Sequence, residues 1–440
     1  MPSRIKKYFA GISVFLFLLI AIVLAVRAVW NYVEGRKLAA VLEKTKAGGG
    51  PLSMKELLSN CPESQNAADL WKASWALLPK DNPGKRALNL AVQDLFNGRL
   101  PEGESRAVLA DLVKKNQPLF TLMTEASNRP CLRFHDWSRP AYEGEFGSAI
   151  SILNSTRLLA VDAVLLAESG DVEGGLNRCA AGLRLSRMLT DEPFLINGLI
   201  AVADTKICLI AVRTILNGRE IAPDILSEWI RALDPLPWRA RFARVIPGER
   251  AFVLEAGLTL LRGDAKALGA HRFWSWLTRP LLKAQVRLLP EIYEGLEKIA
   301  GEPYYAQSAF HENYARMAEA VPERKWFLKT FLTNYQTAFM KEAALEALML
   351  TTRTGLACKL YKNRTGRYPE NLETLLPEYL TEIPVDPFTG KPLVYQIEND
   401  RLLIYSLGSN GKDDGGRSTF LIEKLITEKD DDWTWEEKIR

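Results

Sequence analysis

The longest apolar stretch of the chain lies at its amino terminus, where residues Tyr8 to Val26 form 19 consecutive uncharged positions. An α-helix of this length spans about 28 Å at 1.5 Å per residue, close to the hydrocarbon thickness of a bilayer. Basic residues precede the run and Trp30 and Tyr32 follow it, which is typical of the two membrane interfaces. We therefore predict that residues 1–36 form a membrane anchor and its juxtamembrane segment, with the bilayer bound through Tyr8 to Val26.

Two other interpretations of this run are less favoured. A cleaved signal peptide would have a shorter apolar region, followed by a cleavage site between small residues. A buried core helix is rarely apolar on every face. The orientation of the anchor stays open, because three basic residues precede the run and five, from Arg27 to Lys46, follow it. The positive-inside rule does not decide between these flanks.

Glycine residues separate the anchor from the rest of the chain. Gly48, Gly49 and Gly50 stand in a row before Pro51, and this sequence breaks a helix. We therefore assign residues 37–51 to a hinge. The longer region after the hinge lacks strand-like alternation, and we expect an α-helical body that ends near residue 335.

The spacing of apolar residues predicts the helices of this body, which covers residues 52–335. Apolar positions recur every three to four residues over 149–168, over a second helix that begins near Asp171, and over a third from about 193 to 217. The side chain of Asp171 is suited to cap the second helix. Pro247-Gly248 is expected to divide the region, so the irregular body forms one or two subdomains.

Residues 271–289 allow two interpretations. Basic residues recur every four positions beside tryptophans and leucines, so this segment could lie on a membrane surface with its basic face toward lipid phosphates. It could equally be an ordinary helix of the body with a buried aromatic face. We favour the body helix, because Pro280 is expected to interrupt the segment.

The last part of the chain, residues 336–440, has a different pattern. A helix is predicted over 341–360, followed by a turn and a short second helix. Two apolar segments, 393–397 and 402–406, flank a polar tetrad and predict an antiparallel hairpin. A loop punctuated by glycines follows over residues 407–416. The fold class predicted for the whole chain is thus mainly α, with a small α+β module at the carboxyl end.

Several short motifs in this module follow one another in a fixed order. They are Gly366-Arg367-Tyr368-Pro369, Pro384-Val385-Asp386-Pro387-Phe388, Gly390-Lys391-Pro392 and Tyr405-Ser406-Leu407-Gly408-Ser409-Asn410-Gly411. This succession resembles the soluble domain of the major pseudopilins of type II secretion systems, over less than a fifth of the chain. The whole chain resembles a loose group of uncharacterised membrane-anchored bacterial envelope proteins that combine an anchor, a helical body and this module.

The resemblance implies an orientation, because the pseudopilin domain stands outside the cytoplasmic membrane. We therefore expect a single-pass protein of the cytoplasmic membrane whose body and module are extracytoplasmic. The amino terminus departs from the family, since Gly11-Ile12 is followed by Leu16 where pseudopilins carry a glutamate at the fifth mature position. Assembly into a pseudopilus is therefore not expected.

The resemblance also implies a calcium site in the glycine-rich loop after the hairpin. Its oxygen donors in this chain would be Leu407, Ser409, Asn410, Asp413 and Asp414. Calcium takes six to eight oxygen ligands, and glycines let a loop turn tightly around the ion. Asn410 stands where the family has its first aspartate, and Asn-Gly is itself a strong turn signal, so a metal-free turn is the equal alternative.

Charge and cysteine content exclude some classes of function. Lysine and arginine number 57 against 53 acidic residues, a net charge of +4 that does not indicate a nucleic-acid partner. The cysteines Cys61, Cys131, Cys179, Cys208 and Cys358 are scattered and never paired as CxxC. We expect them to be buried apolar residues, and their spacing gives no evidence for a disulfide.

Catalytic motifs are not evident in the sequence. His135, His271 and His311 lack the spacing of metal-binding or catalytic histidines, and we expect structural roles for them. We therefore predict a non-catalytic, membrane-anchored binding or assembly protein with a protein partner in the envelope, linked to envelope or secretion machinery. The alternative is a membrane-anchored envelope hydrolase that uses carboxylates assembled from distant parts of the helical body.

Overall fold

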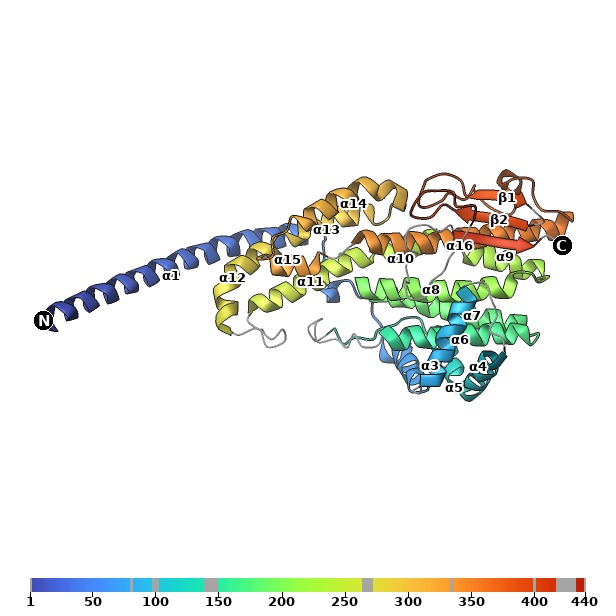
Figure 1. The fold of residues 1–440 in the computed structure, drawn as a ribbon, viewed down its shortest axis with the longest axis horizontal. Helices are drawn as coiled ribbons and strands as arrows, with labels where there is room; N and C mark the ends of the chain where they lie inside the picture. Colours follow the sequence, from blue (N-terminus) through green and yellow to red (C-terminus); the bar gives the residue numbers. More distant parts are fainter. Residues whose placement is uncertain are drawn as a thin grey trace.

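A computed structural model describes residues 2–79, 82–96, 103–137, 149–262, 272–332, 335–398, 401–416 and 433–438. Within these residues the protein is mainly helical, as predicted, with a small three-stranded sheet near the carboxyl end (Figure 1). The elements are α1 (Pro2–Ala47), η1 (Met54–Glu56), η2 (Glu63–Gln65), α2 (Ala68–Trp75), α3 (Asn82–Phe96), α4 (Gly103–Lys115), α5 (Gln117–Ser127), α6 (Ala149–Glu168), α7 (Val172–Met188), η5 (Leu189–Asp191), α8 (Leu195–Leu216), α9 (Pro223–Ala232), α10 (Leu236–Ala243), α11 (Val245–Arg262), α12 (Arg272–Val286), α13 (Leu289–Ile299), α14 (Tyr304–Glu319), α15 (Trp326–Phe331), α16 (Tyr335–Thr365), η7 (Leu372–Leu375), β1 (Val394–Glu398), β2 (Arg401–Ser406) and β3 (Trp433–Lys438).

Helix α1 projects from one end of an elongated body, and the sheet lies at the other end (Figure 1). The apolar side chains from Val14 to Val26 are exposed, whereas Glu34 and Leu38 farther along the helix are buried against the body. The helix ends at Ala47, so the predicted break at the three glycines is confirmed, and residues 37–47 of the predicted hinge are helical.

Among the residues that the structure describes, three helices are long and apolar enough to cross a bilayer, by length and composition. They are the part of α1 from Ser13 to Ala47, α6 and α8. In α8, 83% of the most apolar window is buried inside the protein, and in α6 the share is 56%, whereas none of the window in α1 is buried. Of these three described helices, α1 alone therefore presents its apolar surface to the surroundings along its whole window.

The predicted helices α6, α7 and α8 form the centre of the body and pack on one another. Asp171 caps α7 as predicted, because its Oδ1 accepts a hydrogen bond from the Gly174 amide at 2.8 Å. Close packing of α7 on α8 depends on Gly182, where an added Cβ would lie 2.5 Å from the Cys208 sulfur. Helix α8 ends at Leu216, before a left-handed glycine.

The predicted division at Pro247-Gly248 is wrong, because both residues lie inside α11. Pro247 occupies the first turn of that helix, where a missing amide hydrogen has no cost. Gly248 lets α11 approach the preceding chain, since an added Cβ would lie 1.4 Å from the Pro193 carbonyl oxygen. Pro280 likewise lies inside α12 and does not interrupt it.

Helix α16 joins the body to the carboxyl-terminal module. It packs on α8 and α9 of the body and also on β2 and β3 of the sheet. A single hydrophobic cluster runs from Leu38 in α1 to Trp435 in β3. Gly355 allows the contact between α16 and the sheet, since an added Cβ would lie 2.4 Å from the Trp435 ring. The body and the module therefore share one core.

The strands form an antiparallel sheet in the order β1-β2-β3. The predicted hairpin is confirmed, with Val394 opposite Tyr405 and Glu398 opposite Arg401. The third strand was not predicted and pairs with β2, with Ser406 opposite Trp433. Its addition makes β2 the central strand, and the residues of β2 after Arg401 are buried.

The cysteine prediction requires a correction. Cys61 and Cys131 form a disulfide that closes the chain over a sequence separation of 70. Cys179, Cys208 and Cys358 are free and buried, as expected. The disulfide was not predicted because a pair so far apart in the sequence leaves no local spacing pattern. It ties the segment after η1 to the segment after α5.

Candidate functional site between the body and the carboxyl-terminal module

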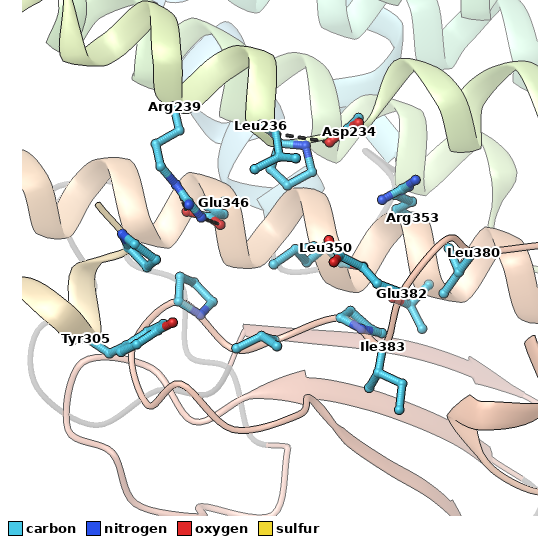
Figure 2. A pocket seen from close by; sticks show the side chains of 16 residues that line it. Asp234, Leu236, Arg239, Tyr305, Glu346, Leu350, Arg353, Leu380, Glu382 and Ile383 are labelled. Carbon is cyan, nitrogen blue, oxygen red and sulfur yellow. Dashed lines mark hydrogen bonds and ion pairs between the residues drawn. The ribbon is translucent and has the colours of Figure 1, made fainter. Parts of the chain in front are cut away.

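An open cleft of about 180 Å³ lies where the body meets the module (Figure 2). Helix α16 forms its floor, and the turn before α10, the start of α14 and the loop before β1 form its walls. The lining residues are Asp234, Pro235, Leu236, Arg239, Pro303, Tyr305, Glu346, Leu350, Arg353, Thr354, Leu380, Glu382, Ile383, Pro384, Val385 and Pro387.

Helical spacing places the floor residues on one face of α16. Glu346, Leu350 and Arg353 follow one another at intervals of four and three residues, so their side chains share a face. The walls are fixed by a backbone hydrogen bond in which the Tyr305 amide donates to the Pro387 carbonyl at 3.0 Å. The cleft is thus built from segments that are distant in the sequence.

A buried ion pair occupies the floor. Both Arg239 Nε and Nη2 donate to the Glu346 carboxylate, with the Nε contact at 3.3 Å, and Figure 2 shows Arg239 reaching from α10 to α16. Burial raises the pKa of Glu346, while Arg239 acts in the opposite direction. Glu342, one turn earlier, is 4% exposed, and burial beside Glu346 raises its pKa to about 8.

The rim of the cleft combines apolar and charged groups. Leu236 and Val385 are exposed large apolar residues, and Tyr305 lies on the far side from Arg239 (Figure 2). Arg353 donates from Nε to the Ile230 carbonyl at 3.1 Å, which holds the base of its guanidinium against α9. This arrangement suits a ligand that contributes both apolar surface and a polar group.

Three of the predicted calcium donors in the glycine-rich loop, Asn410, Asp413 and Asp414, take part in hydrogen bonds within the protein. Asn410 Nδ2 donates to Asp414 Oδ2 at 2.9 Å, and Asn410 Oδ1 accepts from the Lys412 amide at 2.8 Å. Asp413 Oδ1 accepts from the Tyr405 hydroxyl at 2.9 Å. In the described part of the chain, no three or more His, Cys, Asp or Glu residues are grouped so that they could hold a metal ion.

The two remaining predicted donors lie at the start of this loop. Ser409 is exposed, and the Leu407 amide donates to Asp386 Oδ2 at 2.9 Å. Asp386 is 1% exposed and also accepts from the Ser406 hydroxyl at 2.8 Å. Because Asp386 follows directly after cleft residues 383–385, its carboxylate fixes one wall of the cleft to the start of the loop.

Two of the three histidines lie in the described residues, and both are largely buried. His135 Nδ1 lies 3.3 Å from the Glu192 carboxylate, which also accepts from Trp137 Nε1 at 2.8 Å. His311 lies 2.9 Å from Gln307, and burial lowers its pKa to about 4. His271 lies outside the described residues. The partner Glu192 was not predicted, because it is 57 residues away from His135.

Comparison with known proteins gives no relative for this chain. No protein-family model, no curated protein and no solved structure matches it. A role for the cleft or for the glycine-rich loop must therefore be argued from the contacts of their residues. The pseudopilin resemblance is based on the motifs between residues 366 and 411 alone.

Proposed function

We propose that this chain is a single-pass membrane protein whose body and carboxyl-terminal module stand outside the cytoplasmic membrane and bind a protein partner. The observation that carries the proposal is the contrast within α1. Its apolar window is exposed throughout, while the helix beyond Arg27 docks on the body. An exposed helix of this length and polarity is stable in a bilayer and costly in water.

The disulfide supports an extracytoplasmic orientation. Disulfides persist in the periplasm and other oxidising compartments and are rare in the cytosol. Cys61 and Cys131 both belong to the body. The basic residues on either side of the apolar run did not decide on which side of the membrane the body lies. An oxidised pair there supports the same side of the membrane as the pseudopilin resemblance implies.

The cleft supports a protein partner. Its volume of about 180 Å³ is smaller than the roughly 300–1,000 Å³ typical of small-molecule sites. A cleft of this size can take one or two side chains of a partner, with Leu236 and Val385 as exposed apolar contacts. The order of helix, hairpin and glycine-rich loop supports a link with secretion machinery, which the resemblance implies.

The orientation is tested by the oxidation state of Cys61 and Cys131 in cells. After rapid acid quenching and denaturation, a maleimide–polyethylene glycol reagent should add to three thiols before reduction and to five after reduction. A Cys61→Ser variant should show four thiols in both cases and serves as the control. Five reactive thiols in the wild type without reduction would place the body in the cytoplasm.

The binding function is tested by photo-cross-linking in intact membranes. A photoreactive residue at Val385 in the cleft should give a discrete protein adduct, whereas one at Ile397, exposed on β1 away from the cleft, should not. Leu236→Asp places a charge on the cleft wall and should abolish the Val385 adduct. Equal adducts at both positions, or an adduct that survives Leu236→Asp, would contradict a binding role for the cleft.

A further inference from the structure

The joint between α1 and α12 is held by contacts that begin at the first residue after the apolar run. Arg27 donates from Nη2 to the Trp276 carbonyl and stacks on the Trp276 ring, with its guanidinium carbon 3.4 Å from the ring centroid. Lys283 donates to the Asn31 carbonyl at 3.0 Å. These contacts fix α12 beside the point where α1 leaves its apolar segment.

The position of these contacts along α1 sets their depth. Arg27, which contacts Trp276, lies one residue beyond Val26, or about 1.5 Å along the helix axis, and Trp30 lies four residues beyond Val26, or about 6 Å. The headgroup layer on each side of the hydrocarbon core is about 5–7 Å thick. In Figure 1, α12 is the element of the body nearest to the projecting half of α1. If α1 spans the bilayer, the Trp276 end of α12 therefore lies at headgroup level.

The surface of α12 at this level is apolar and aromatic. Trp276 is 42% exposed and Leu277 is 39% exposed, and Trp30 of α1 is exposed at the same level. Tryptophan and leucine are the residues that interfacial helices place between headgroups and acyl chains. Exposed apolar side chains at this site are costly in water and are accommodated by lipid.

Three cations lie together at the same joint. Burial lowers the pKa of Lys283, and the nearby charges of Arg279 and Arg27 lower it further. Arg279 is held by the Leu261 carbonyl at 3.0 Å, and among the described residues none of the three pairs with a carboxylate. Arg287 differs, because it pairs with Glu34 at 2.9 Å.

We propose that the amino-terminal half of α12 is a bilayer-surface contact, in which Trp276 and Leu277 enter the headgroup layer and the cluster of Arg27, Arg279 and Lys283 receives the phosphates of anionic lipids. This proposal rests on the anchor of the proposed function. The contact fixes the body at a set angle to the membrane, because it adds a second attachment beside α1. Phosphates supply the negative charge that the protein itself does not place at this cluster.

The test measures the depth of single fluorescent labels on the full chain in vesicles. An environment-sensitive probe is attached to Leu277→Cys, with Leu18→Cys as the marker of the acyl region and Ile397→Cys as the marker of water. Wild-type protein, whose free cysteines are buried, gives the labelling blank. Lipids with nitroxides on the headgroup or on the acyl chain quench the probe according to its depth.

The label at residue 277 should be quenched by headgroup nitroxides several-fold more strongly than the label at 397, while the label at 18 responds to acyl-chain nitroxides. If the label at 18 is in the acyl region and the label at 277 behaves like that at 397, the surface contact is wrong and the anchor stands. If the label at 18 is in water, the anchor itself is wrong.

A second arm tests the phosphate contact. Quenching at residue 277 should rise when phosphatidylglycerol is added to phosphatidylcholine vesicles, and Lys283→Gln should reduce this rise. Glu373→Gln, an exposed change on η7 far from the joint in sequence, is the matched control and should leave the rise intact. Quenching that is independent of phosphatidylglycerol would contradict the role of the three cations.

Discussion

The apolar half of α1 and helix α8 have similar compositions and opposite surroundings. Both belong to helices that are long and apolar enough to cross a bilayer. The apolar window of α8 is mostly enclosed by α6, α7, α11 and α16, whereas that of α1 is exposed on all sides. A long apolar run therefore does not distinguish a membrane span from a core helix. The proposal that α1 is the span rests instead on its surroundings, since none of its apolar window is buried.

The two helices also differ in whether they carry charged residues. Helix α8 carries Asp204 and Lys206, which are 0% and 4% exposed. Asp204 lies near Arg157 of α6, and Lys206 lies near Glu342 of α16. Burial raises the pKa of Asp204 to about 7 and lowers the pKa of Lys206 to about 7, so both groups hold their charge less readily than in water. The run from Tyr8 to Val26 carries no charge at all. A core helix can hold such groups because burial shifts them toward their neutral forms beside polar neighbours, whereas a charged group in lipid is costlier.

The largest expected effect comes from placing the same charge in each helix. Leu209 of α8 is fully buried, so Leu209→Asp should destabilise the detergent-solubilised protein by more than about 4 kcal/mol. Leu18→Asp in α1 should leave the melting temperature in detergent unchanged and should lower membrane insertion by about 3 kcal/mol. Thermal unfolding and the membrane-bound fraction measure the two effects. Similar melting temperatures for Leu209→Asp and Leu18→Asp would contradict the prediction that α8 is a core helix and that the apolar run of α1 lies outside the core.

Loss of the disulfide should have the next largest effect and should act on the body alone. Cys61→Ser opens a loop closed over a separation of 70 residues, and this should lower the free energy of unfolding by about 2–4 kcal/mol. Deletion of residues 2–26 should leave that value nearly unchanged, since none of the apolar window of α1 is buried. Chemical denaturation of both variants in detergent provides the measurement. If the Cys61→Ser variant has the same free energy of unfolding as the wild type, the disulfide between Cys61 and Cys131 does not stabilise the body.

The buried carboxyl opposite α8 should make stability fall as pH rises. Burial raises the pKa of Glu342 from 4.5 to about 8, so the folded protein holds this proton more tightly than the unfolded chain. The contribution is fully present below pH 4.5 and is lost as pH rises toward 8.

Glu342→Gln tests this assignment because an amide cannot titrate. The variant should show a flatter dependence of unfolding free energy on pH between 5 and 8, and it should gain stability relative to the wild type at pH 8. Glu373→Gln, an exposed change, should keep the wild-type slope. An unchanged slope in Glu342→Gln would show that this carboxyl is ionised in the folded protein.

The smallest effect concerns the glycine-rich loop of residues 407–416, which follows β2. If the calcium prediction holds, calcium at ten times its dissociation constant should stabilise the protein by about 1.4 kcal/mol, and magnesium should do less. The double change Asp413→Asn and Asp414→Asn keeps oxygen acceptors for Tyr405 and Asn410 while removing both charges. It should abolish the calcium effect and preserve metal-free stability. Equal melting of the wild type in calcium and in chelator would establish the metal-free turn.

Local patterns in the sequence were sufficient for elements whose stability depends on near neighbours. The spacing of apolar residues predicted α6, α7 and α8, and Asp171 gave the start of α7. The alternation on either side of a polar tetrad predicted the pairing of β1 with β2. Pro247 was misleading because the same residue favours both a break and the first turn of a helix.

Features that depend on distant parts of the chain were not predictable in this way. Strand β3 pairs with β2, although residues 417–432 separate the two in the sequence beyond the glycine-rich loop. The six residues of β3 show no pattern from which this pairing could be predicted. The disulfide and the pairing of His135 with Glu192 join residues that are 70 and 57 positions apart. The cleft combines side chains from α10, α14, α16 and the loop before β1, so its existence depends on the packing of all four.

The most direct test of the account compares one labelled position on each of the two apolar helices in intact spheroplasts. Ile196 in the first turn of α8 is 41% exposed, and Leu18 lies within the apolar run of α1. An impermeant maleimide added outside the cells should react with Ile196→Cys at once and should not react with Leu18→Cys even after lysis without detergent. Protection of Ile196→Cys until lysis or solubilisation would contradict an extracytoplasmic body anchored by α1.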